Sequence, residues 1–317
     1  MEAARCVERL RPYGKTLTDA VNHYVRHLAS VQRSATVAEL VGKYIAAKEA
    51  QGRSAVHLAD LRTRLGRFAG TFGKRLAAEI TIQDVEGWLD GIPLSAQSIN
   101  HHRDKVSSLF EYAVARGYAT ENPVAKIPKR KVVRGTPGIL STEQLRRLLN
   151  ATPFEMLPYI AIGAFAGLRS AEILRLDWRS VDLSRRIILL DTGTTKTSQR
   201  RIVKISDNLA TWLAPYARRE GRVWPFEDSK LYVELRKLLP AAGLPEWPDN
   251  CLRHSFCSYH LAKWQNGNET AEQAGHDPKV LRQHYRELVL PADADAYWQI
   301  APDMPAGVLP MGQTVAS

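Results

Sequence analysis

The octapeptide AGLRSAEI at residues 166–173 joins two helical patterns in the second half of the 317-residue chain. Gly167 interrupts a predicted apolar helix, and Arg169 opens the next helix. An arginine in that place lies at a helix N-terminus, where backbone N–H groups and the helix dipole also favour an anion. A surface arginine paired with Glu172 would leave the same pattern. The octapeptide therefore decides the architecture only together with the segments around it.

The second half of the chain alternates helical patterns with one pair of strands. Strand-like runs at 186–190 and 201–205 flank a segment rich in Gly, Thr and Ser, which predicts a β-hairpin. Helices are expected over 142–150, 155–166, 169–176, 207–218, 227–239, 250–264, 268–274 and 278–285. These elements predict a mixed α+β domain over 139–302. The Pro-, Gly- and Ala-rich stretch 303–317 is typical of a mobile tail.

The first half of the chain shows only helical spacing of its apolar residues. Five such patterns cover 17–28, 37–50, 55–69, 82–90 and 95–116. They predict an N-terminal helical segment of unknown role over 1–35 and a helical domain over 36–123. The following stretch 124–138 is rich in Pro, Gly and basic residues, which indicates a basic linker. The expected fold class is mainly α, with a small β-hairpin or sheet in the second domain.

The charge of the chain is basic and uneven. In total, 44 Lys and Arg residues exceed 33 Asp and Glu residues, for a net charge of +11. Residues 1–140 hold 22 basic and 13 acidic residues (+9), and 141–317 hold 22 and 20 (+2). A basic first half suits a polyanion such as DNA, because each neutralised phosphate releases counterions. A basic protein with no nucleic-acid partner would show the same balance.

Composition favours a chain that works inside the cell, in the cytoplasm. The longest apolar-rich run, 157–168, is too short to span a bilayer, and the N-terminus lacks a signal-peptide core. Cys6, Cys251 and Cys257 form no CxxC pair and no zinc-like cluster with histidines. A reducing setting fits this usage. No metal, cofactor or membrane partner is expected.

Four further segments carry side chains suited to one reaction. Lys196 lies in the hairpin turn, and Arg253 lies on the helix predicted over 250–264. His276 sits in a turn, and Tyr285 follows it by nine residues. Each residue alone is weak evidence of function, because lysines in turns, arginines on helices and tyrosines in cores are common.

Taken in order, these segments resemble the tyrosine recombinases, also called the phage integrase family. The family pattern is Arg in a GLR-x-x-E context, Lys in a hairpin, His-x-x-Arg in an LRH context, Gly-His, and Tyr nine residues after that His. The matching positions here are Arg169, Lys196, Asn250, Arg253, His276 and Tyr285. The resemblance covers roughly 37–300 and is sharpest from 163 to 285.

The resemblance implies a reaction as well as a fold. Tyr285 would attack a DNA phosphodiester and become a 3′-phosphotyrosyl link. Arg169 and Arg253 would bind the non-bridging oxygens of the transition state, and His276 would add a hydrogen bond. Lys196 is the candidate acid for the departing 5′-oxygen. The covalent link keeps the phosphoester energy, so rejoining would need neither ATP nor a metal.

One position departs from the family pattern. Asn250 stands where the family usually has its first histidine. An amide can donate a hydrogen bond to a phosphate oxygen, but it cannot take up a proton near neutral pH. We therefore expect Asn250 to act as a phosphate donor, in an enzyme slower than one with histidine.

The helical domain and the linker supply the residues expected to grip DNA. One polar face of the helix 95–116, suited to a major groove, is formed by Asn100, Arg103 and Ser107. A solvated face would show the same pattern. The expected contacts to the DNA backbone, which position without reading sequence, are Arg62, Arg64, Arg67, Lys129, Arg130 and Lys131.

The partners implied are double-stranded DNA and further copies of the chain, since recombination needs several protomers on paired sites. Two other functions remain open at this stage. A type IB topoisomerase uses similar chemistry on one duplex. A DNA-binding protein that has lost catalysis would tolerate Asn250.

Overall fold

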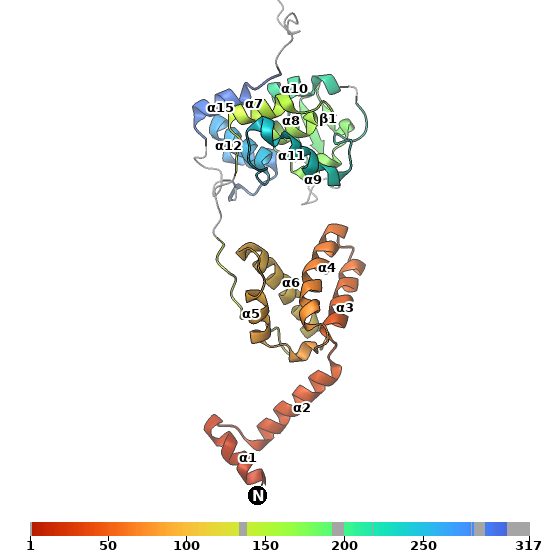
Figure 1. Ribbon diagram of the computed structural model, residues 1–317, viewed down its shortest axis with the longest axis vertical. Helices are drawn as coiled ribbons and strands as arrows, with labels where there is room; N and C mark the ends of the chain where they lie inside the picture. The colour runs from red at the N-terminus through yellow and green to blue at the C-terminus, as the bar shows by residue number, and fades with distance from the viewer. Residues whose placement is uncertain are drawn as a thin grey trace, which may run out of the picture. The chain divides into compact units, whose positions relative to one another are not determined.

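The computed structural model of the chain describes residues 2–132, 138–191, 200–217, 219–279, 281 and 289–302, without the side chains of 26, 27 and 29–31. It divides into two compact units, Met1–Arg134 and Gly135–Ser317, which Figure 1 draws in one picture. The predicted fold class is confirmed: the chain is mainly helical, with one small antiparallel sheet in the second unit. Within the described residues, no helix is long and apolar enough to cross a membrane.

The first unit is built from helices alone in its described part. Its helices are α1 (Glu2–Leu10), α2 (Leu17–Arg33), α3 (Val37–Ala50), α4 (Ala55–Phe72), α5 (Ile82–Asp90) and α6 (Ala96–Ala115), with short 3-10 turns at Arg11–Tyr13 and Ala77–Glu79. Thr36, Ser54, Thr81 and Ser95 cap the N-termini of α3 to α6 with their hydroxyl groups. Apolar side chains from these four helices form one core. Figure 1 shows the four helices grouped together.

The stretch predicted as a linker begins as part of this helical unit. Val124 and Ile127 are buried in the same core as α3 to α6. On α6, Arg103 donates from Nε to the carbonyl of Ile127 (2.8 Å) and from Nη2 to that of Val124 (3.2 Å). A solvated tether makes no such contacts, so the prediction of a linker from residue 124 is wrong for its first part. Residues 133–137 lie outside the described ranges.

The second unit packs helices around α8, with a small sheet at one side. Its helices are α7 (Thr142–Ala151), α8 (Leu157–Ala166), α9 (Ser170–Arg175), α10 (Asp207–Leu213), α11 (Leu231–Ala242), α12 (Cys251–Trp264), α13 (Gly267–Ala274) and α15 (Pro291–Trp298). Nearly every side chain of α8 is buried, and the helix contacts α7, α9, α10 and α12 (Figure 1). A helix apolar on all sides suits this central place.

The sheet contains the predicted hairpin and one additional strand. Its strands are β1 (Val181–Asp182), β2 (Ile187–Leu190) and β3 (Arg201–Lys204), in the order β1-β2-β3. β2 pairs antiparallel with β3, and Ile188 lies opposite Val203. Residues 192–199, which join these two strands and include Lys196, lie outside the described residues.

Among the described helices of the second unit, three differ from the sequence prediction by more than two residues. The helix expected over 207–218 ends at Leu213 and continues as a 3-10 turn, Ala214–Tyr216, where Pro215 supplies no backbone N–H. α11 starts at Leu231, after the 3-10 turn Asp228–Lys230, and is therefore later than predicted. The sequence prediction missed α15, whose first residue is Pro291; proline is tolerated in a first helical turn.

Gly167 joins α8 to α9 in a conformation that only glycine adopts easily. Its φ is +64°, and a Cβ built on it would lie 2.2 Å from the ring of Phe256 on α12. Both the left-handed backbone and the close approach of α12 therefore require glycine.

Replacing Gly167 by alanine is expected to destabilise the protein by roughly 2–5 kcal/mol, the sum of left-handed strain and overpacking. Chemical unfolding would measure the loss. Gly221→Ala is the matched control, since Gly221 has φ +83° but no atom within 4 Å of an added Cβ. Equal losses in the two variants would contradict the packing argument.

Candidate active site

Arg169 lies at the junction that the octapeptide predicted. It is the N-cap residue of α9, and its backbone N–H donates to Oε2 of Glu172 (2.9 Å). Its Nη1 donates to Oε1 of the same carboxylate (2.9 Å), and its Nη2 donates to the carbonyl of Gly275 (2.6 Å). The guanidinium is thus held from two sides while 27% of the side chain stays exposed. The pairing with Glu172 exists, but it belongs to a larger cluster.

Glu172 is the buried centre of this cluster. Only 1% of its side chain is exposed. Arg201 on β3 donates from Nη1 to Oε1 (3.1 Å) and from Nη2 to Oε2 (2.8 Å). Burial alone would raise the pKa of the Glu172 carboxyl, but the contacts with Arg201 and Arg169 outweigh it and leave that pKa below its ordinary value. A carboxylate therefore sits between two guanidinium groups.

Arg253 projects from the first turn of α12 and is 5% exposed. Its Nη1 donates to the carbonyl of Gly167 (2.6 Å), and its Nε donates to Nε2 of His276 (3.2 Å). Its Nη2 is buried and has no partner among the described residues. Burial lowers the pKa of Arg253 to about 10, so the group still carries its charge at neutral pH. An unpartnered buried donor is costly unless an acceptor joins it.

His276 follows the left-handed Gly275 that ends α13. Burial and the charges of Arg253 and Arg169 lower the pKa of His276 to about 3, so the ring is neutral at ordinary pH. Since its Nε2 accepts from Arg253, the proton of the neutral ring lies on Nδ1. His276 therefore takes part as a neutral hydrogen-bonding group.

The structure brings together three of the six residues predicted for catalysis: Arg169, Arg253 and His276. Lys196 and Tyr285 lie outside the described residues, and their roles stay predictions. Sequence reasoning weighed Glu172 only as a rival partner of Arg169 and assigned no role to Arg201. The GLR-x-x-E spacing signals Glu172, whereas no local pattern signals Arg201, because its partner is 29 positions away.

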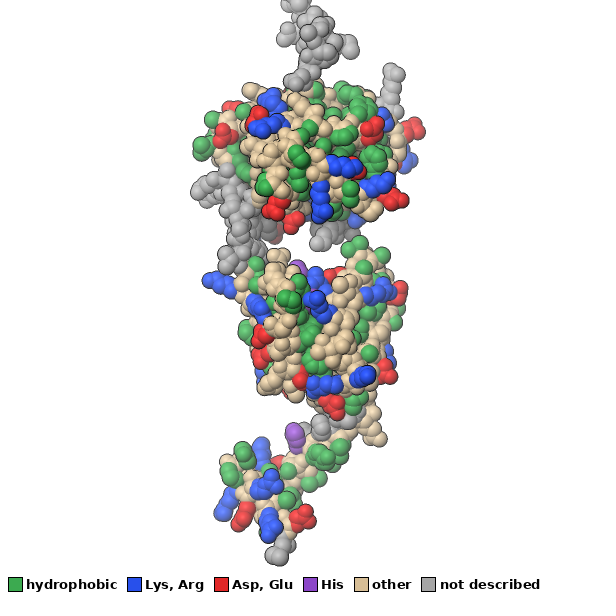
Figure 2. Space-filling view, in the orientation of Figure 1, with side chains coloured by type: hydrophobic (Ala, Val, Ile, Leu, Met, Phe, Trp, Pro, Cys, Tyr) green, Lys and Arg blue, Asp and Glu red, His purple; other side chains and the backbone are tan. Residues whose placement is uncertain are grey.

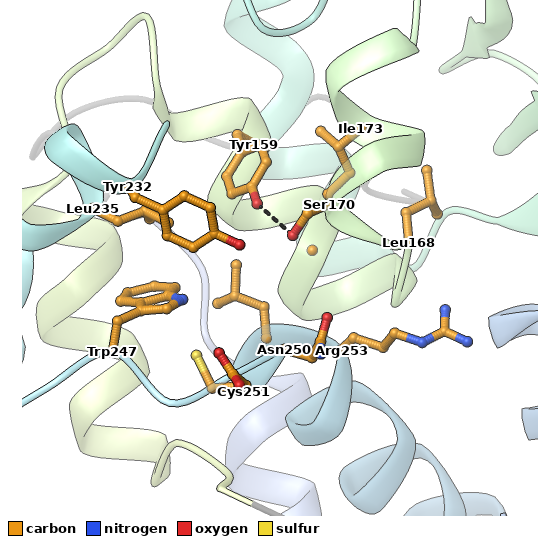
Figure 3. Close-up of a pocket in the computed structure, with 13 residues that line it drawn as sticks. Tyr159, Leu168, Ser170, Ile173, Tyr232, Leu235, Trp247, Asn250, Cys251 and Arg253 are labelled. Atoms are coloured by element: carbon orange, nitrogen blue, oxygen red, sulfur yellow. Dashed lines mark hydrogen bonds between the residues drawn. The ribbon is translucent and has the colours of Figure 1, made fainter. Parts of the chain in front are cut away.

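Asn250 lies beside this group, at the N-cap of α12. Its φ is +55°, and its side chain makes no capping hydrogen bond. With Arg253 it lines a cavity of about 50 Å³ whose wall includes Tyr159, hydrogen-bonded through its hydroxyl to Ser170 (2.9 Å) (Figure 3). In Figure 3 the Arg253 guanidinium points away from Tyr232 and the other aromatic side chains of this cavity. Asn250 is exposed and not committed to capping, which suits a hydrogen-bond donor.

The polar face of α6 is not the open surface that its spacing predicted. Asn100 donates from Nδ2 to the carbonyl of Arg130 (2.8 Å) and accepts from its N–H (2.8 Å). Arg103 donates to the carbonyls of Ile127 and Val124, and 14% of its side chain is exposed. Ser107 accepts from Asn122 (3.1 Å). These side chains hold the chain after α6, and their expected contact with a DNA groove stays a prediction.

The expected contacts to the DNA backbone occupy surface positions. Figure 2 shows basic and acidic side chains interspersed on the face of the helical unit in view. Several of the basic side chains have acidic neighbours: Arg62 with Glu49, Arg64 with Asp60, Lys129 with Asp104 and Arg130 with Asp90. Arg67 and Lys131 are exposed. Surface pairs of this kind contribute little and can open toward a phosphate, so these contacts stay predictions.

Comparison with known proteins assigns both units. The phage integrase family matches residues 139–289, and the phage integrase central domain matches 37–130. The chain is 26% identical over 230 residues to the tyrosine recombinase XerC of Vibrio vulnificus (strain YJ016), covering 66% of this chain and 72% of that one. It is 24% identical over 212 residues to XerC of Xanthomonas axonopodis pv. citri (strain 306), covering 62% and 68%.

Two solved structures share the fold. A lambda integrase dimer bound to a COC′ core site superposes with a TM-score of 0.69 at 15% identity, covering 90% of this chain and 85% of that one. The Tn1549 transposon integrase with circular intermediate DNA gives 0.65 at 17% identity, covering 82% and 98%. The chain therefore belongs to the phage integrase family, the tyrosine recombinases. Its class is that of enzymes which break and rejoin DNA strands.

Proposed function

We propose that the chain is a site-specific DNA recombinase or integrase in which Tyr285 forms a 3′-phosphotyrosyl intermediate. The observation that carries this proposal is the meeting of Arg169, Arg253 and His276 from three separate elements. A partly buried group of oriented donors suits an oxyanion whose charge grows during the reaction. Nη2 of Arg253, which has no partner among the residues that the structure describes, supplies one donor for it.

The proposed chemistry assigns each group one step. The Tyr285 phenol releases its proton to solvent as its oxygen attacks phosphorus, and the bond from phosphorus to the 5′-oxygen breaks. Lys196 gives a proton to the departing 5′-oxygen. The two arginines hold the non-bridging oxygens with their planar guanidinium groups, and neutral His276 contributes a hydrogen bond. Attack by another 5′-hydroxyl then reverses these steps and releases Tyr285.

Asn250 takes the place of a basic group near the phosphate and donates a hydrogen bond there. Asn250→His is therefore expected to raise the single-turnover cleavage rate, by at most roughly 10²-fold, the low end of a general base contribution. Histidine is compatible with the left-handed backbone of this position. Asn250→Ala is the control and should cleave more slowly than the natural chain. If Asn250→His cleaves no faster, the assigned role is wrong.

The proposed partners are double-stranded DNA and further copies of this chain. The lambda integrase structures that share the fold include a dimer on a core site and a tetramer on a Holliday junction. Assembly of several protomers on paired sites would follow from the same reaction. Such an enzyme would act on DNA in the cytoplasm, where its free cysteines stay reduced.

A nicked duplex that loses a short fragment after cleavage tests this proposal, because the lost fragment cannot return to reverse the reaction. We expect a denaturation-resistant protein–DNA adduct, and mass spectrometry of the nuclease-trimmed adduct should place the nucleotide on residue 285. Failure to form an adduct on any cognate site would favour the binding-only function. Relaxation of supercoiled DNA without strand exchange would instead favour a topoisomerase.

A further inference from the structure

We infer that Arg201 is a positioning residue of the reaction, which acts through Glu172 to fix the Arg169 guanidinium at the scissile phosphate. The inference rests on the proposed function of the site. Arg201 would not touch DNA itself. It would hold the carboxylate that orients an arginine that does.

The contacts of Glu172 are shared evenly between the two arginines. Oε1 accepts from Nη1 of Arg169 (2.9 Å) and from Nη1 of Arg201 (3.1 Å). Oε2 accepts from the backbone N–H of Arg169 (2.9 Å) and from Nη2 of Arg201 (2.8 Å). Removing Arg201 leaves each oxygen with a single donor, both from Arg169, and so loosens the hold on the carboxylate. Arg169 would then be held firmly only through the Gly275 carbonyl, and its orientation would be less well fixed.

Arg201 also contacts the second anchor of Arg169. A Cβ added to Gly275 would lie 2.6 Å from Nη1 of Arg201, so the two residues are packed against each other. The carbonyl of Gly275 accepts from Nη2 of Arg169 (2.6 Å). Arg201 therefore supports both groups that hold the Arg169 guanidinium.

The remaining atoms of Arg201 argue against direct phosphate binding. Both of its Nη atoms are committed to the Glu172 carboxylate, which balances the charge of Arg201. Its Nε is buried, with no partner in the described part of the chain. In contrast, Arg253 is held by a carbonyl and a neutral histidine, and 27% of the Arg169 side chain is exposed. Arg169 and Arg253 are thus the arginines whose charge is left for the substrate.

The strand that carries Arg201 links two parts of the site. Arg201 is the first residue of β3, and the same strand is tied to α13. There the N–H of Lys204 donates to Gln273 (2.9 Å), and Nζ of Lys204 pairs with Glu269 (2.8 Å). Since α13 leads into Gly275 and His276, a change at Arg201 is expected to disturb both the arginine and the histidine.

The test compares Arg201→Gln with Arg200→Gln, a neighbouring arginine that is 81% exposed and pairs with Asp191. Single-turnover cleavage is measured with saturating nicked duplex, and DNA affinity is measured separately. Arg201→Gln is expected to cleave roughly 10–10²-fold more slowly, the effect of a misplaced catalytic group. Its DNA affinity should be unchanged. Arg200→Gln should keep the natural rate, and Arg201→Lys should recover part of it.

A substrate with an uncharged group at the scissile position distinguishes a positioning role of Arg201 from a general loss of structure in the variant. A methylphosphonate lacks one of the charged oxygens that Arg169 would neutralise, so Arg201→Gln should slow its cleavage less than that of the ordinary phosphate. Equal slowing of both substrates would show a structural role only and overturn the inference. A natural rate in Arg201→Gln would also overturn it. An unmodified protein that forms no adduct would overturn both this inference and the proposed function.

Discussion

Replacing Tyr285 by phenylalanine is expected to abolish the covalent adduct on a nicked duplex while leaving DNA binding intact. Phenylalanine lacks the hydroxyl that attacks phosphorus, so it cannot form the phosphotyrosyl ester. The loss should therefore be complete within the detection limit of the gel. Retention of the electrophoretic mobility shift would show that the variant still folds and binds.

Tyr297 provides the matched control for this substitution. It is fully buried, its hydroxyl donates to the carbonyl of Ala164 (2.6 Å), and its ring stacks on Tyr259. Tyr297→Phe should lose some stability, because a buried carbonyl loses its donor, but should still form the adduct. An adduct that persists in Tyr285→Phe would remove Tyr285 from the reaction.

The second large effect is expected at Arg253. Arg253→Ala should reduce the cleavage rate by at least roughly 10²–10³-fold, the loss seen when one donor to a developing oxyanion is removed. The substitution removes the donor Nη2 and leaves the Gly167 carbonyl and His276 without their partner. Single-turnover cleavage at saturating DNA measures this effect.

Arg253→Lys separates charge from geometry. Lysine keeps the positive charge but has a single ammonium group. It cannot replace a planar guanidinium that contacts the Gly167 carbonyl, His276 and the phosphate at once. We expect its rate to lie between those of the natural chain and Arg253→Ala, close to the alanine variant. Arg236→Ala, on the exposed side of α11, is the control for loss of one positive charge. If Arg253→Lys cleaves at the natural rate, the planar guanidinium of Arg253 does not have the role assigned to it.

The sequence predicted the site better than its surroundings. Glycine breaks and helix starts are local signals, and they located Arg169, Arg253 and His276 on the elements that bring them together. The ordered set then resembled one family, which the comparisons confirmed. The contact between Arg201 and Glu172 was not predictable, because it joins a strand to a helix that only the tertiary fold brings together.

The face of α6 shows a different limit. Asn100, Arg103 and Ser107 have the spacing of a recognition face, and helical periodicity cannot tell whether such a face meets solvent, DNA or the chain itself. Here the backbone of the following segment needed hydrogen-bond partners, and these side chains supply them. A polar helix face next to a proline-rich segment can therefore bind DNA, face solvent, or donate hydrogen bonds to the backbone of that segment.

The carbonyls of Gly167 and Gly275 affect the net positive charge that the site presents to DNA. Gly167 ends α8 and Gly275 ends α13, so the oxygens that hold Arg253 and Arg169 are those of helix C-termini. A helix C-terminus carries only about half a negative charge, so it orients a guanidinium without neutralising it. Three arginines and one glutamate then leave a net of two positive charges, which matches the two negative charges of a pentavalent phosphorane better than the single charge of the resting phosphodiester.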